Sequence, residues 1–169
     1  MKYGQTFGAL YDEILSRLKA DGIILSAEND VPYPDWWNKT ITVYNKYIDD
    51  ENRCVTWHRH VLQGCYFGTK ETKSISGTEV QLSSSLIARV PYSFAYLPAH
   101  KWIATEKGEY FTFQTGDIII GCECEATIDE STKGSRSDDL LSQYPGNAFM
   151  IKVFADNTGV ELRHYKVEG

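Results

Sequence analysis

Two histidines and two cysteines offer the strongest candidate chemistry in the sequence. His58 and His60 flank Arg59, and Cys122 and Cys124 flank Glu123. Side chains two residues apart on a β-strand point to the same face about 7 Å apart, so each pair is co-facial if its segment is a strand. Two imidazoles and two thiolates on neighbouring strands could bind zinc tetrahedrally. Nothing indicates that the two strands pair, so buried core thiols and histidines at the rim of the core are the competing interpretation.

A cysteine–histidine pair for nucleophilic catalysis could come from the same region, because Cys54 and Cys65 bracket the two histidines. No local signature of a thiol enzyme surrounds them. Ser83–Ser85 lacks the glycines of a nucleophile elbow. Two aspartates after Ser137 suit the first turn of a helix and would repel an anion. The sequence therefore predicts no catalytic residue, no cofactor and no resident metal.

The composition indicates one folded domain that is rich in strands. The chain has 169 residues, of which 42% are apolar and 13% aromatic, and it contains eleven tyrosines and four tryptophans. This content is enough for a sizeable core, and the aromatic residues favour strands and contact surfaces. A net charge of −6 argues against a nucleic-acid-binding surface, which needs clustered lysine and arginine.

Targeting signals are not evident in the sequence. Residues 1–6 lack the apolar stretch of a secretory signal, and no window approaches about 18 uninterrupted apolar residues. We expect a protein that is made in the reducing cytoplasm, with free thiols and no membrane span.

The N-terminal part, residues 1–38, is predicted to be a helical arm followed by a Pro/Trp linker, and residues 39–169 a β-rich domain. Apolar residues recur with helical spacing over Thr6–Ala20, which predicts an amphipathic helix that packs on the surface or docks on a neighbouring subunit. In the linker, Tyr33, Trp36 and Trp37 are candidates for partner contact, although such residues also commonly seal the edge of a core.

The rest of the sequence predicts a mainly β (α+β) fold, as an antiparallel β-barrel or sandwich. Apolar alternation predicts strands over residues 40–47, 53–67, 86–91, 102–105, 109–114, 117–125, 148–155 and 160–167. Gly64 is a predicted bulge or bend, and residues 137–144 are a predicted short helix. The Ser- and Lys-rich segment Lys70–Ser85 is interpreted as a long, mobile excursion between strands.

Several of these segments, taken in order, resemble a family of small uncharacterised proteins from the structural-gene clusters of tailed phages and prophages. The similar segments are Ile41–Tyr47, Trp57–Phe67, Ile87–Pro91 with the later Trp102, Tyr110–Gly121, and the C-terminal Leu162–Gly169. The resemblance covers residues 40–169. The N-terminal part and Lys70–Ser85 depart from it.

The resemblance implies a virion structural or assembly protein, either a stopper-like head–tail connector or a minor capsid component. Its partners would be portal, adaptor or tail proteins, with a possible homo-oligomeric ring and no specific nucleic acid. Its location would be the virion, after the host cytoplasm before assembly. Two alternatives stay open: an intracellular β-rich binding module of prophage origin, and a zinc- or thiol-dependent enzyme.

Overall fold

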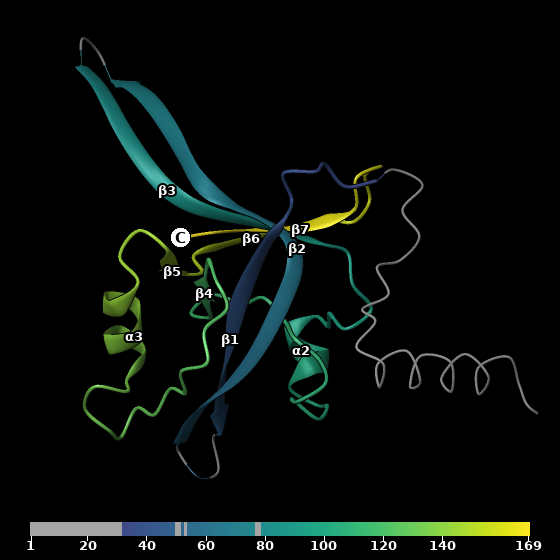
Figure 1. Cartoon of the computed structure of the whole chain (residues 1–169), viewed down its shortest axis with the longest axis vertical. Helices are drawn as coiled ribbons and strands as arrows, with labels where there is room; N and C mark the ends of the chain where they lie inside the picture. The colour runs from purple at the N-terminus through teal and green to yellow at the C-terminus, as the bar shows by residue number, and fades with distance from the viewer. Residues whose placement is uncertain (1–31, 50–51, 53, 77–78) are drawn as a thin grey trace, which may run out of the picture.

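The computed structural model describes residues 32–49, 52, 54–76 and 79–169. These residues form a mainly antiparallel β structure with two short helices (Figure 1). In chain order the elements are β1 (Lys39–Asp49), β2 (Cys54–Ser76), β3 (Glu79–Pro91), α2 (Ala99–Trp102), β4 (Ile118–Ile120), α3 (Ser137–Gln143), β5 (Ala148–Met150), β6 (Val153–Asn157) and β7 (His164–Glu168). The predicted helix Thr6–Ala20 lies outside the described residues.

β2 takes part in two different ladders along its length. Its first part, up to Cys65, pairs with β1, and the part from Tyr66 onwards pairs with β3 on the opposite edge. The change follows a bulge, because Lys39 lies opposite Cys65 whereas Ile41 lies opposite Leu62. Gly64 lies in this bulge with φ 68°, a left-handed conformation that glycine adopts without steric cost. The predicted bulge at Gly64 is confirmed.

The seven strands form one sheet in the order β5-β4-β1-β2-β3-β7-β6. β5 and β6 lie at the two edges, although only Ile151 and Lys152 separate them in the chain. The Ile151 amide donates to Asp117 O on one side, and the Lys152 amide donates to Glu168 O on the other. The edges are thus joined by a covalent connection and not by a ladder. The mainly β, antiparallel prediction is confirmed, but the sheet is not closed into a barrel.

Alternate residues of β1 enter two different hydrophobic clusters. Ile41 and Val43 are fully buried in the main cluster, which also contains residues from β3, β4, β5 and β7. Tyr44 points the other way and packs with Ile118 and with Leu140 of α3. Because both of its faces are covered, β1 is a nearly continuous run of buried residues.

The segment Lys70–Ser85 is a paired β-hairpin, so its interpretation as a mobile excursion is wrong. Residues 66–76 of β2 pair one by one with residues 79–89 of β3. Threonine suits strands because it is β-branched, and the scattered apolar residues Ile75, Val80 and Leu82 all lie on one face of the hairpin.

Two predicted strands before β4 are also absent from the described structure. In the predicted strand 102–105, Trp102 is the last residue of α2 and the other residues follow the helix. Trp102 is fully buried, and its indole Nε1 donates to Tyr110 O at 2.7 Å. Residues 109–114 make only the isolated bridge between Phe111 and Tyr96. Both segments bury large aromatic rings through side-chain packing, which does not require a ladder.

The predicted strands 40–47, 53–67 and 86–91 are present as β1, β2 and β3 with longer bounds, and the predictions after residue 116 agree in kind with shorter bounds. Of the predicted strand 117–125, only Ile118–Ile120 pairs, as β4. The predicted helix 137–144 is α3, which begins after Arg136 as its N-cap. The two C-terminal strands are present, the first being divided into β5 and β6.

Replacing Gly64 should destabilise the fold by an amount that depends on the new backbone preference. A Cβ at this position would meet only Trp37 O, at 3.9 Å, so the cost comes from φ and not from crowding. We expect Gly64→Ala to lower the free energy of unfolding by about 1–2 kcal/mol in urea denaturation, Gly64→Val to lower it more, and Gly64→Asn to lower it least.

Gly108→Ala is the matched control for Gly64→Ala. No atom lies within 4 Å of a Cβ there, and the φ of Gly108 is not in the left-handed region. An equal loss of stability in both variants would contradict the role of Gly64 in the bulge.

Candidate interaction surface

The four candidate zinc ligands lie on opposite faces of the sheet. The His58 ring packs edge-on against Trp102, with ring centroids 5.7 Å apart, and His60 packs against Phe111. Cys124 lies on the other face, where its Sγ is 3.3 Å from the Tyr44 hydroxyl, and Cys122 packs in the same cluster. The structure therefore does not bring these residues together. Within the described part of the chain, no group of three or more His, Cys, Asp or Glu is placed to hold a metal ion.

The protonation of these groups reflects their burial. Desolvation, followed by the nearby His58, lowers the pKa of His60 to about 4. Desolvation raises the pKa of Cys65 to about 12. Desolvation also opposes ionisation of Cys124, but hydrogen bonds from Tyr144 and Tyr44 and the charge of Arg59 outweigh it and lower the pKa. Cys124 is only 2% exposed, so its thiol is closed to substrates from solvent.

Asp117 is a fully buried carboxylate that fastens the 112–117 segment to β1. Its Oδ2 accepts from Asn45 Nδ2 at 2.7 Å and from the Gln114 amide at 3.0 Å, and its Oδ1 accepts from the Lys46 amide at 2.8 Å. Desolvation raises the pKa of Asp117 to about 6, and these hydrogen bonds offset only part of the effect. This arrangement positions the turn that leads into β4.

The largest exposed feature is a two-stranded arm, which we define as residues 69–76 of β2 and 79–86 of β3. Figure 1 shows it projecting from the rest of the sheet as a ribbon. Its strands pair with each other, whereas β1 and β7 pair only with residues nearer the body. Within the described structure the arm is therefore stabilised mainly by its own ladder.

The arm has one apolar face and one polar face. Ile75 lies opposite Val80, and Lys73 lies opposite Leu82, so these four side chains share a face. Of the three aliphatic residues, Ile75 is 77% exposed, Val80 62% and Leu82 69%. We call them the apolar face of the arm. It continues the side of the sheet on which Leu86 and Ala88 pack into the main cluster.

The other face of the arm is polar. It carries Lys70 and Thr72 from β2 and Ser83 and Ser85 from β3. Lys70 Nζ contacts both carboxylate oxygens of Glu168, at 3.2 and 3.3 Å. The arm is therefore amphipathic, and its aliphatic side faces solvent. An exposed aliphatic patch of this kind is typical of a protein–protein contact.

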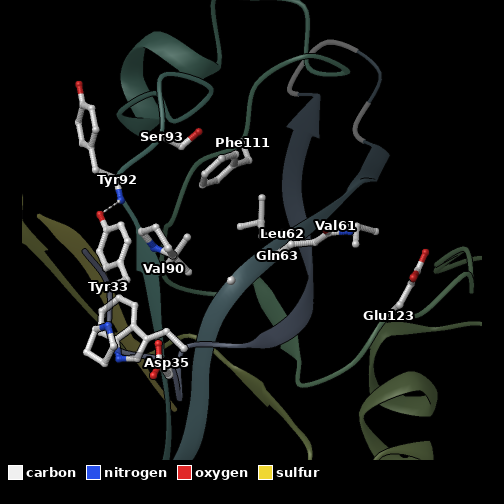
Figure 2. Close-up of a pocket in the computed structure, with 14 residues that line it drawn as sticks. Tyr33, Asp35, Val61, Leu62, Gln63, Val90, Tyr92, Ser93, Phe111 and Glu123 are labelled. Carbon is white, nitrogen blue, oxygen red and sulfur yellow. Dashed lines mark hydrogen bonds between the residues drawn. The ribbon is translucent and has the colours of Figure 1, made fainter. Parts of the chain in front are cut away.

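A pocket of about 720 Å³ lies at the base of the arm, and we call it the basal pocket (Figure 2). Its aromatic and aliphatic lining includes Tyr33, Trp37, Leu62, Val90, Tyr92 and Phe111. The exposed carboxylates of Asp35 and Glu123 also line it, and Glu123 lies 4.0 Å from the Arg59 guanidinium. The lining of the pocket thus combines aromatic and aliphatic side chains with polar groups and two carboxylates.

The predicted partner-contact residues separate into buried and exposed side chains. Trp37 is 7% exposed and stacks on Tyr33 with ring centroids 5.2 Å apart. Tyr33 accepts from the Tyr92 amide at 3.0 Å and donates to Arg163 O. Both residues fix the linker against the sheet and form a wall of the basal pocket. Trp36 is 65% exposed and stays available to a partner.

The sequence did carry a signal for the arm. Val80 and Leu82 are two residues apart after Gly77–Thr78 and Ile75 lies two residues before it, which is compatible with a hairpin that has one apolar face. The many serines and threonines between them hid this signal. Among the described residues, no helix has the length and apolar character required to cross a membrane.

The buried Asp117 should make stability depend on pH. Its folded pKa of about 6 lies above the value of about 3.9 for an unfolded chain, so folding favours the proton. The corresponding stabilisation is complete below about pH 4 and is lost as the pH rises through 6. Relative to Asp117→Asn, which does not titrate, the wild type should lose on the order of 2 kcal/mol of unfolding free energy between pH 4 and pH 7. A difference that does not change with pH in denaturant titrations would contradict this.

The two tryptophans of the linker should differ sharply in their effect on stability. Trp37→Ala removes a buried ring and should lower the free energy of unfolding by about 3–5 kcal/mol. Trp36→Ala changes an exposed side chain and should stay within about 0.5 kcal/mol of the wild type. Thermal and denaturant unfolding of both variants measures this, and equal losses would mean that Trp36 is also part of the folded core.

A family model matches the greater part of the chain, whereas no individual curated protein or solved structure matches it. The model of a family of unknown function (DUF6751) matches residues 36–169, which include every described strand and helix. The chain belongs to this family.

Proposed function

We propose that this protein is a structural or assembly component of a phage or prophage particle, which acts through protein–protein contacts. The position that fits best is a stopper-like head–tail connector or a minor capsid component. Portal, adaptor or tail proteins would be its neighbours. The protein would be in the host cytoplasm before assembly and in the virion afterwards.

The observation that carries this proposal is the amphipathic arm. Its three aliphatic side chains are more than 60% exposed and form one continuous face. Leaving such a face in water is unfavourable, and burying each side chain would contribute about 1.5–3 kcal/mol. A ribbon that presents this face beyond the body is suited to insertion into a neighbouring subunit.

The resemblance of residues 40–169 to proteins of phage structural-gene clusters supports the same role. Components of rings and shells present the same surface repeatedly, so they need arms and exposed edges more than they need a catalytic centre. Cys65 and Cys124 fit this, because both are buried in the hydrophobic clusters.

The exposed Trp36 favours one alternative, which is an intracellular binding module of prophage origin. In that case the partner would be a soluble host protein, and Trp36 would be the anchor of the contact. The buried position of Trp37 weakens this alternative, because one of the two tryptophans is already used by the fold.

The test is the protein composition of purified particles. We expect the chain to be present in several copies per particle by quantitative mass spectrometry. Particles made with Ile75→Asp/Leu82→Asp should contain at least tenfold less of it, because charge on the apolar face cannot be buried in a neighbour. Both residues are exposed, so the variant should fold.

The matched control is Ser74→Asp/Ser83→Asp, which adds the same charge to the polar face of the arm at the same diagonal offset as Ile75 and Leu82. This variant should be incorporated like the wild type. Absence of the wild-type chain from purified particles would contradict the proposal, and retention in a complex with one host protein would favour the binding module.

A further inference from the structure

Two surfaces of the described structure that carry aliphatic or aromatic side chains are exposed at the same time. One is the apolar face of the arm, and the other is the basal pocket. One is convex and projects from the body, whereas the other is concave. A single contact between them would remove both from water.

We propose that the arm of one copy docks in the basal pocket of a second copy, so that the chains associate head to tail. This inference rests on the proposed assembly role and names the neighbour: a further copy of the same chain. The occupant of the pocket is the apolar face formed by Ile75, Val80 and Leu82.

The arm cannot reach the pocket of its own chain. Gly64 lines the pocket, and Ile75 lies eleven positions further along the same strand, which is paired without interruption from Tyr66 to Ser76. At about 3.3 Å per residue, the aliphatic end of the arm is about 35 Å from the pocket. Bending the arm back would break its ladder, so a second molecule must supply it.

Size and charge of the two surfaces are complementary. A volume of about 720 Å³ is in the range that encloses several side chains, and its aromatic walls suit aliphatic groups. Lys73 lies opposite Leu82 at the aliphatic end of the arm, and Glu71 lies two residues nearer the body on the same face. Asp35 and Glu123 line the pocket. The arm contains two lysines and two glutamates, so the net charge of −6 belongs to the rest of the chain. A neutral arm that carries a lysine at its aliphatic end is therefore not repelled by the acidic body of its neighbour.

The contact uses a different surface on each partner. A reciprocal exchange of arms closes a dimer where the rotation between neighbours is about 180°, because both pockets are then filled. With other rotations the contacts close into a larger ring where the angle permits it, and otherwise extend as a filament.

Sedimentation velocity of the full chain over a range of concentrations tests the docking. The wild type should associate in a concentration-dependent way, as a closed dimer, a larger ring or a filament. Ile75→Asp/Leu82→Asp should raise the dissociation constant by roughly a hundredfold or more, because two buried aliphatic side chains are lost. Val61→Asp in the pocket lining should have a similar effect, with its fold checked by circular dichroism. Ser74→Asp/Ser83→Asp, on the polar face, should associate like the wild type.

Mixing the two defective variants decides the geometry. The arm variant keeps an intact pocket, and Val61→Asp keeps an intact arm. We therefore expect a mixture of the two to form a one-to-one dimer and to stop there. A monomeric mixture would overturn the pocket as the receptor, and unchanged association of the arm variant would overturn the arm as the occupant.

A charge exchange provides a test with exposed residues alone, so it does not depend on the folding of Val61→Asp. Lys73→Glu should weaken association about two- to fivefold, and Asp35→Lys/Glu123→Lys should do the same. In a mixture of these two variants, the altered arm of one chain meets the altered pocket of the other with opposite charges. This contact should regain the wild-type affinity. Failure to recover would overturn the pairing of Lys73 with the pocket.

The inference and the assembly role can fail separately. A wild-type chain that stays monomeric at every concentration would overturn self-docking, even if the chain is found in particles. Its absence from particles would overturn the assembly role, even if it associates in solution.

Discussion

The change of partner along β2 is the constraint on which the rest of the structure depends. Up to Cys65 this strand completes one ladder with β1, and from Tyr66 it begins another with β3 on its opposite edge. The bulge at Gly64 allows the transition because it adds one residue to β2 and turns the strand. Without this device, a 23-residue strand would continue straight past the body. With it, the first part contributes to the core and the second becomes the arm.

The burial of β1 on both faces follows from the same arrangement. Odd-numbered residues such as Ile41 and Val43 face the main cluster, and Tyr44 faces the cluster under α3. Polar residues in such a strand need internal partners. Thr42 donates to Cys122 O at 2.8 Å, and Asn45 donates to both Thr112 O and Asp117. These polar contacts hold the irregular segments after and before β4 against the sheet, so β1 organises the parts of the chain that have little secondary structure of their own.

The sequence was informative wherever one face of a segment is buried. The alternation in residues 40–47 and the apolar run at 86–91 predicted β1 and the inner part of β3, and Gly64 predicted the bulge. The arm was missed because both of its faces meet solvent, so serine and threonine are as acceptable as valine and the alternation is diluted. Trp102 and Phe111 were misassigned for a different reason: an apolar aromatic residue indicates burial but not the backbone that delivers it. The difference between Trp36 and Trp37 also has no sequence signal, because it depends on which ring stacks on Tyr33.

The arm and the wall of the core share two uninterrupted backbones, those of β2 and β3. A force applied at the far end of the arm is therefore carried into the body by a ladder of hydrogen bonds loaded along the strands, and not by the packing of a hinge. In the proposed assembly, a neighbour that held this arm would be connected to the core through continuous strands. Tension between subunits would be borne by covalent chain and in-register strands, which resist sliding far better than two smooth apolar surfaces do.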